Sequence, residues 1–168
     1  AYREAKLALF GRVLPEGAPA VLNADDPSLE AARAVCAARG QPVTTVGRAG
    51  DLRLLDVAYD GDGQRLRLAW RGEEHAVRLS LIGGFQAENA TMAAALALAT
   101  GEGVGDVIAA LPRLRGVRGR MEPVARRANG ARVFVDYAHT PDGLAAAIRA
   151  LRPHIAGRIV IVFGAGGD

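Results

Sequence analysis

The chain has 168 residues, of which 50% are hydrophobic and 23% are charged, with a formal net charge of +3. This length fits one globular domain, or one and part of another, and the apolar content excludes a disordered tail. No stretch reaches the ~18–20 unbroken apolar residues of a membrane helix, and the start, Ala1-Tyr2-Arg3-Glu4, is not a signal peptide. The single cysteine, Cys36, excludes a disulfide framework and is interpreted as a small hydrophobe. We therefore expect a soluble, cytoplasmic protein without a membrane partner.

The positive charge does not by itself indicate a nucleic-acid partner. The basic residues are scattered, Arg126-Arg127 is the longest basic run, and only 5% of the residues are aromatic. We therefore expect no surface on which bases could stack, and no nucleic-acid partner. Lys6 is the only lysine, and no glycine stands just before it. A phosphate loop of the G-x-x-x-x-G-K-[ST] type is therefore not possible in this sequence.

Strands and helices alternate in the first part of the chain. The expected elements are an amphipathic segment at 2–10, a strand at 18–22, a helix at 28–39 and a strand at 42–46. Asp26-Pro27 marks the helix start, because the fixed φ of proline suits the first helical turn, and Gly40 ends the helix. This β-α-β order predicts a parallel sheet covered by helices.

A different pattern follows, with alternating runs at 52–59, 64–70 and 74–81. Asp-Gly and Arg-Gly turns separate these runs, which predicts an antiparallel meander. After Gly83-Gly84 we expect an alanine-rich helix at 85–100 and a shorter helix at 104–111.

The glycine- and arginine-rich segment 115–120 marks a joint. Beyond it we expect strands at 121–125 and 132–136, a helix that begins at Thr140-Pro141-Asp142, and a strand at 158–163. Threonine suits the N-cap, proline the first helical position and aspartate the positive end of the helix dipole. The sequence ends in glycines directly after the last predicted strand, where an α/β domain would continue into a helix, so we interpret it as a fragment of a longer protein.

Asn89 is the first candidate binding residue. In the predicted helix it shares a face with Phe85, Met92 and Leu96, and a primary amide on an apolar face needs hydrogen-bond partners. One interpretation is a core asparagine satisfied by nearby backbone. The other is a ligand contact, because the amide offers a donor and an acceptor that match the N6/N7 edge of adenine. Gln86, one turn earlier, is expected at the surface.

Asp136, Tyr137 and His139 form a second candidate group just past a predicted strand, at the edge where α/β sheets bind ligands. A carboxylate there can accept both hydroxyls of a ribose, and a histidine can contact a phosphate or a base. The alternative is that Asp136 and His139 only tie the loop together.

Arg120, with Arg115 and Arg118, is the third candidate, because guanidinium groups suit bidentate phosphate contacts. The alternative is a solvated joint between domains. Two weaker signals are the run 164–167, which could hold an anion, and Asp25-Asp26, which could approach a metal but equally suit a turn.

Several ordered motifs resemble those of one enzyme family. They are LIGGFQAENA at 81–90, similar to L-x-G-x-F-N-x-x-N-x-x-A; GVRGRME at 116–122, similar to G-V-x-G-R-M-E; DYAHTPD at 136–142; VFGAGGD at 162–168; and NADDP at 23–27. In this order they resemble the Mur ligases, and among these the branch of UDP-N-acetylmuramoyl-tripeptide synthetases.

The resemblance implies an α/β fold in two parts. Residues 1–117 would form the second half of the central ATP-binding domain, a parallel sheet with helices plus a small antiparallel meander. Residues 118–168 would begin a Rossmann-like C-terminal α/β domain. The family uses ATP and Mg²⁺ to activate the carboxylate of a UDP-N-acetylmuramoyl-dipeptide as an acyl phosphate, and the amine of an added amino acid, here a diamino acid, displaces the phosphate.

By motif position, Asn89 would contact adenine, Arg120 the phosphates and Asp136 the ribose, with His139 beside the nucleotide. Gln86 stands where the family has an asparagine, which leaves one adenine contact open. The phosphate loop and the magnesium ligands lie outside the chain, so we assign it no catalytic or metal-binding residue and expect it to be monomeric and inactive alone. The alternatives are a related ligase, of the cyanophycin or folylpolyglutamate synthetase type, and a non-catalytic nucleotide-binding or interaction domain.

Overall fold

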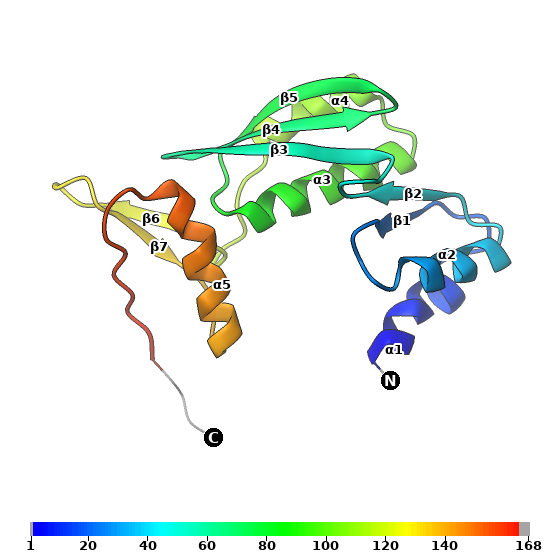
Figure 1. Cartoon of the computed structure of the whole chain (residues 1–168), viewed down its shortest axis with the longest axis horizontal. Coiled ribbons are helices and arrows are strands. Elements are labelled where there is room, and N and C mark those ends of the chain that lie inside the picture. The colour runs from blue at the N-terminus through cyan, green and yellow to red at the C-terminus, as the bar shows by residue number, and fades with distance from the viewer. Residues whose placement is uncertain (1, 165–168) are drawn as a thin grey trace.

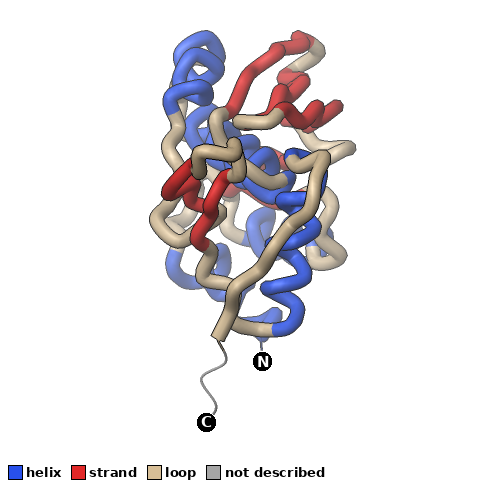
Figure 2. Tube along the Cα trace, turned by 90° about the vertical axis from the view of Figure 1, so that its left-hand side faces the viewer, coloured by secondary structure: helices blue, strands red, loops and turns tan. Residues whose placement is uncertain are grey.

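The computed structural model describes residues 2–164, which form two lobes joined by a short segment (Figure 1). We call residues 2–114 the first lobe and residues 119–164 the second lobe. The first lobe holds a five-stranded sheet with helices, and the second holds a two-stranded hairpin and a helix. Figure 2 shows the molecule from the end where the second lobe lies, with strands in red and helices in blue.

The sheet of the first lobe has the strand order β1-β2-β3-β4-β5. The strands are β1 (Ala20–Asn23), β2 (Val43–Val46), β3 (Leu52–Asp60), β4 (Gly63–Trp70) and β5 (Glu73–Leu79). β1 and β2 are parallel along their whole length, β2 and β3 are parallel through the pair Val46–Leu52, and β3, β4 and β5 are antiparallel. The predicted parallel unit and the predicted meander are therefore both confirmed, and they share one mixed sheet.

Helices cover both faces of the parallel strands. The helices of the first lobe are α1 (Tyr2–Ala8), the π-helix Leu9–Val13, α2 (Leu29–Ala38), α3 (Gly84–Ala99), α4 (Val104–Ala110) and the 3₁₀ turn Leu111–Arg113. Leu22 packs with Cys36 of α2, whereas Val21, on the opposite face, packs against the cluster that contains α3. Cys36 is completely buried, as a small hydrophobe would be, and burial raises the pKa of its thiol.

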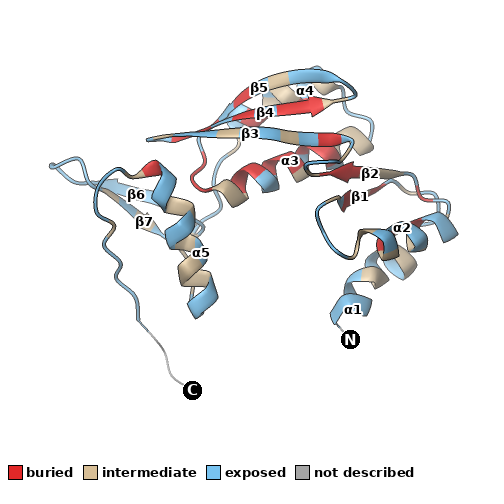
Figure 3. Ribbon diagram, viewed as in Figure 1, coloured by how far each residue is buried: buried red, intermediate tan, exposed pale blue. Residues whose placement is uncertain are grey.

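The main core lies between α3 and the antiparallel part of the sheet. On β4, Leu66 and Leu68 are buried while Arg65 and Arg67, which alternate with them, are exposed, which is the two-residue period of a strand with one covered face. Figure 3 shows the buried residues concentrated in this sheet and in α3. The start of α3 thus packs against the buried face of the sheet.

The second lobe begins with the hairpin β6 (Glu122–Arg126) and β7 (Arg132–Val135), which are antiparallel. α5 (Pro141–Leu151) follows and continues into the 3₁₀ turn Arg152–His154. The predicted N-cap is confirmed, because the Thr140 hydroxyl accepts the Gly143 N–H at 3.1 Å.

One predicted element is wrong. Residues 158–163 form no strand, and Val160 and Val162 are 73% and 96% exposed. A strand needs a neighbour for its backbone hydrogen bonds, and no strand in the described range 2–164 pairs with this run. The anion-binding role suggested for 164–167 falls mostly outside the described residues. Within 2–164, no helix combines the length and the hydropathy needed to cross a membrane.

Candidate functional site

A cavity of about 460 Å³ lies where the first lobe, the joint and the second lobe meet. Its first wall comes from the segment before α3 and from α3 itself, and its second wall comes from the 3₁₀ turn, the joint and the start of the hairpin. Its charged lining residues are Arg113, Arg115 and Arg120. All three are positive, so the cavity suits an anionic ligand.

Gln86 brings a polar side chain to this cavity from the first turn of α3. It is only 9% exposed, and no described residue makes a hydrogen bond to its side-chain amide. The amide atoms are not themselves buried without a partner, so they are open to the cavity and free to donate to and accept from a ligand there. The prediction that Gln86 lies at the surface is wrong. The signal for its burial was the row of small residues that follows it at four-residue intervals, Ala90 and Ala94, which lets α3 approach the sheet closely.

Asn89 shares a face of α3 with Phe85, Met92 and Leu96, as predicted, but this face does not point into the core. Asn89 is exposed, as is Leu96, while Phe85 and Met92 on the same face are only partly buried. This face is therefore not the core-facing stripe, and the interpretation of Asn89 as a core asparagine is wrong. Asn89 does not line the cavity that contains Gln86 and Arg120. Its proposed contact with adenine stays a prediction.

Arg120, Tyr137 and His139 gather beside the joint. The Arg120 guanidinium lies over the Tyr137 ring, 5.2 Å from its centroid, and the His139 ring meets Tyr137 edge to face at 5.1 Å. His139 Nδ1 is 3.0 Å from the Tyr137 carbonyl oxygen. Since all three side chains are exposed, the stack presents one cation and one titratable ring to solvent next to the cavity.

Asp136 organises the backbone beside Arg120. Its Oδ2 accepts the Met121 N–H and its Oδ1 accepts the Ala138 N–H, both at 2.9 Å. Met121 has φ +47°, a left-handed conformation that is costly for a non-glycine residue, and the Asp136 bond helps to hold it. The carboxylate therefore ties the loop together, which was one of the two interpretations. A ribose contact by Asp136 stays a prediction.

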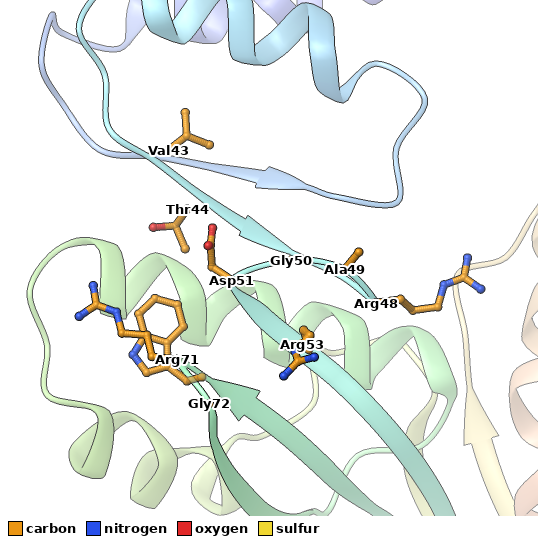
Figure 4. A pocket seen from close by; sticks show the side chains of 10 residues that line it. Val43, Thr44, Arg48, Ala49, Gly50, Asp51, Arg53, Arg71 and Gly72 are labelled. Carbon is orange, nitrogen blue, oxygen red and sulfur yellow. The ribbon is translucent and has the colours of Figure 1, made fainter.

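Two other cavities lie away from these residues. Figure 4 shows one of about 610 Å³, in which Arg48 and Arg71 extend toward opposite ends. Here the Asp51 carboxylate accepts the backbone N–H and the hydroxyl of Thr45, each at 2.7 Å. Because its guanidinium groups do not converge, we assign this cavity no ligand. The other, of about 670 Å³, lies at the carboxyl ends of β1 and β2 and includes Glu88, the neighbour of Asn89.

The acidic pair Asp25-Asp26 serves the turn after β1. Asp26 Oδ1 accepts the Ser28 N–H at 2.7 Å, and this backbone hydrogen bond lowers the pKa of Asp26. Asp25 accepts the Arg48 N–H at 3.2 Å. Within residues 2–164, no group of three or more His, Cys, Asp or Glu side chains is arranged to hold a metal ion.

Two family models and several relatives match the chain. Residues 1–97 match the Mur ligase middle domain, and residues 119–168 match the glutamate ligase domain of Mur ligases. The UDP-N-acetylmuramoyl-L-alanyl-D-glutamate–2,6-diaminopimelate ligases of Bradyrhizobium diazoefficiens and Zymomonas mobilis are 50% and 49% identical to it, over 173 and 169 residues. Each alignment covers 99% of this chain.

A solved structure of a ligase with the same name superposes with a TM-score of 0.79 at 29% identity, covering 99% of this chain and 34% of that one. The chain spans 35% of the length of the two curated relatives. The middle-domain model alone matches more than half of the chain, and the predicted resemblance is confirmed. The chain therefore belongs to the Mur ligase family.

Proposed function

We propose that this chain is part of an ATP-dependent ligase that joins 2,6-diaminopimelate to a UDP-N-acetylmuramoyl-dipeptide. The dipeptide carboxylate would take the terminal phosphoryl group of ATP, which releases ADP, and the amine of the added amino acid would then displace phosphate to form the amide bond. The names of relatives about 50% identical to the chain support this substrate pair. They favour it over the cyanophycin and folylpolyglutamate alternatives.

One observation carries the assignment of a nucleotide site to this chain: the unpartnered Gln86 amide lines the same cavity as Arg120. An amide offers the donor and acceptor that a base edge needs, and guanidinium groups suit phosphates. In this proposal Arg120 and Arg115 bind phosphate oxygens, and Gln86 takes the place of the first family asparagine. Asn89, Asp136 and His139 would contact the same nucleotide from the edge of the site. The domain boundary would fall near Val117, between the regions matched by the two family models.

Magnesium, when bound, would neutralise charge on the phosphoryl group in transfer. Within residues 2–164 there is no group of three or more side chains that could hold a metal ion, so its ligands would come from outside this range. Lys6 cannot serve a phosphate loop, so we expect the 168-residue chain alone not to turn over ATP. We also expect the intact protein to act in the cytoplasm as a monomer.

The test measures how tightly a non-hydrolysable ATP analogue binds to the intact protein of which this chain is a part. Gln86→Ala and Arg120→Ala should each weaken binding by about tenfold or more, the size of one buried or charge-assisted hydrogen bond. Arg71→Ala is the matched control, since Arg71 lines the separate cavity of Figure 4, and it should leave the affinity unchanged. Equal affinities for all three variants would refute the site.

Phosphate release that depends on both the UDP-linked dipeptide and 2,6-diaminopimelate would support the ligase reaction. Release that depends instead on a folate substrate would favour the folylpolyglutamate alternative. Nucleotide binding without any phosphate release would favour the non-catalytic one.

A further inference from the structure

His154 is a buried histidine that joins the second lobe to the first. It ends the 3₁₀ turn after α5, and only it and Met121 are buried among the described residues of the second lobe. Its Nδ1 lies 2.8 Å from the Asp60 carbonyl oxygen, and its Nε2 lies 3.1 Å from the Gly83 nitrogen. A backbone N–H can only donate, so Nε2 must accept and Nδ1 must carry the proton that it donates to Asp60. The contacts thus select one neutral tautomer.

Gly83 is held on every side. Its φ of +100° suits glycine, and a Cβ there would lie 3.1 Å from the Cβ of Ala150, so α5 contacts the glycine backbone directly. Its N–H goes to His154, and its carbonyl oxygen accepts both the Gln64 amide, at 3.0 Å, and the Gln86 N–H, at 3.0 Å. A single residue, Gly83, therefore connects His154 of the second lobe to the first turn of α3 through the peptide groups on its two sides.

Arg132 makes a second connection at the same place. Its side chain is only 12% exposed, and its guanidinium donates to the Gly61 carbonyl oxygen and to Asp62 in the β3–β4 turn. It also donates to the His154 carbonyl oxygen at 3.2 Å. Arg132 thereby connects the backbone of His154 to the β3–β4 turn, which directly follows Asp60.

We propose that His154 is a positioning residue of the nucleotide cavity. By accepting the Gly83 N–H when the second lobe is seated, it fixes the start of α3 and with it the Gln86 amide opposite Arg120. Only the second lobe, when it is docked on the first, supplies this acceptor, so the geometry of the cavity depends on that docking. His154 itself does not line the cavity. This role rests on the nucleotide site proposed above, whereas the hydrogen bonds of His154 can be tested without any nucleotide.

Three substitutions separate the two bonds. Phenylalanine keeps a ring against Tyr59, which the imidazole meets edge to face at 5.0 Å, but makes neither bond. The amide of asparagine reaches the position of Nδ1 and can donate only to Asp60, while the longer glutamine reaches the position of Nε2 and can accept from Gly83. We expect His154→Phe and His154→Asn to weaken binding of the ATP analogue by about tenfold in the intact protein, and His154→Gln to stay within about threefold.

The first measurement is made on the 168-residue chain by NMR. We expect the ¹⁵N shifts of His154 to report the neutral Nδ1–H tautomer, and the Gly83 amide to exchange at least about tenfold more slowly than in His154→Phe. Trp70 fluorescence confirms that each variant is folded. An Nε2–H tautomer, or an unprotected Gly83 amide, would overturn the proposal.

The second measurement is the affinity series in the intact protein. If Gly83 loses its protection in His154→Asn while the affinity is unchanged, the coupling to the cavity is refuted. If glutamine fails to rescue while asparagine does, the Asp60 bond matters and the Gly83 route is wrong. If the unmodified protein binds no nucleotide, the proposed function falls and the positioning role falls with it, whereas the tautomer and exchange results still describe the joint.

Discussion

Gln64 offers a sharp test of the buried hydrogen bonds beneath α3. It lies on β4 with no exposed surface, and its Nε2 donates to the carbonyl oxygens of Leu81, at 3.2 Å, and Gly83, at 3.0 Å. Gln64→Glu replaces this donor with a carboxylate that faces two carbonyl oxygens. We expect a loss of several kcal/mol in the free energy of unfolding at pH 7, because an unpaired charge is then buried where both bonds were made.

Gln64→Leu is the matched control, and its cost can be worked out from the same contacts. The Gly83 oxygen keeps its bond from the Gln86 N–H, whereas the Leu81 oxygen loses its one donor among the described residues, at about 1–3 kcal/mol. The Oε1 atom of Gln64 is itself buried without a partner, and its removal recovers a similar amount. These two amounts roughly cancel, and the bond to the Gly83 oxygen is also lost, so the net loss should be about 1 kcal/mol, well below that of Gln64→Glu.

The assay is urea unfolding followed by the fluorescence of Trp70, the only tryptophan, which lies on the same strand. Burial favours the protonated form of the introduced carboxyl group, so the folded variant binds a proton more tightly than the unfolded chain. Its deficit relative to Gln64→Leu should be largest at pH 7 and shrink as the pH falls toward about 4. Equal unfolding midpoints at pH 7, or a deficit that does not change with pH, would refute the reasoning.

Two further predictions concern single caps and turns. Thr140→Ala removes the acceptor of the Gly143 N–H, so α5 should lose about 1 kcal/mol and its first-turn amides should exchange faster by NMR, while Thr140→Ser should preserve them; equal exchange in the two variants would contradict the cap. At Asp51, burial works to raise the pKa, but hydrogen bonds from Thr45 hold it below the ordinary 3.8. The stability from these bonds is present above pH 3.8 and is lost as the pH falls through the lower folded pKa, so the original chain should lose stability relative to Asp51→Asn in urea melts between about pH 5 and about pH 2.

Local patterns predicted most of the elements because their signals are local. The Asp-Gly turns, the alternation on β4 and the threonine N-cap of α5 each act within a few residues, and the structure contains all of them. The prediction of a final strand at 158–163 was wrong because a strand does not depend on local signals alone. The apolar, β-branched composition of this run favours an extended chain, but a strand also needs a hydrogen-bonding neighbour, and composition does not supply one.

The predictions for the site residues failed where the outcome depends on packing between distant parts of the chain. Nearly every residue of α3 is apolar or small, so hydropathy could not identify the buried face, and the large side chains Phe85, Met92 and Leu96 pointed to the wrong one. Close packing against the sheet instead selects the alanine face, which buries Gln86 and exposes Asn89. The importance of His154 could not be predicted from the sequence, because both hydrogen bonds of its ring are to backbone groups more than 70 positions away.

The joint between the lobes differs in kind from the cores within them. Neither hydrophobic cluster contains a residue beyond Leu114. The described contacts that His154 and Arg132 make across the joint are hydrogen bonds to backbone groups, an ion pair to Asp62 and one edge-to-face ring contact with Tyr59. Such bonds can be exchanged for water without exposing a large apolar surface, so separation costs little, yet their directions allow only one seated arrangement. A cavity with walls from both lobes then takes its shape from these few contacts, so the proposed nucleotide site is expected to be about as sensitive to His154, which never touches the nucleotide, as to Gln86 and Arg120, which do.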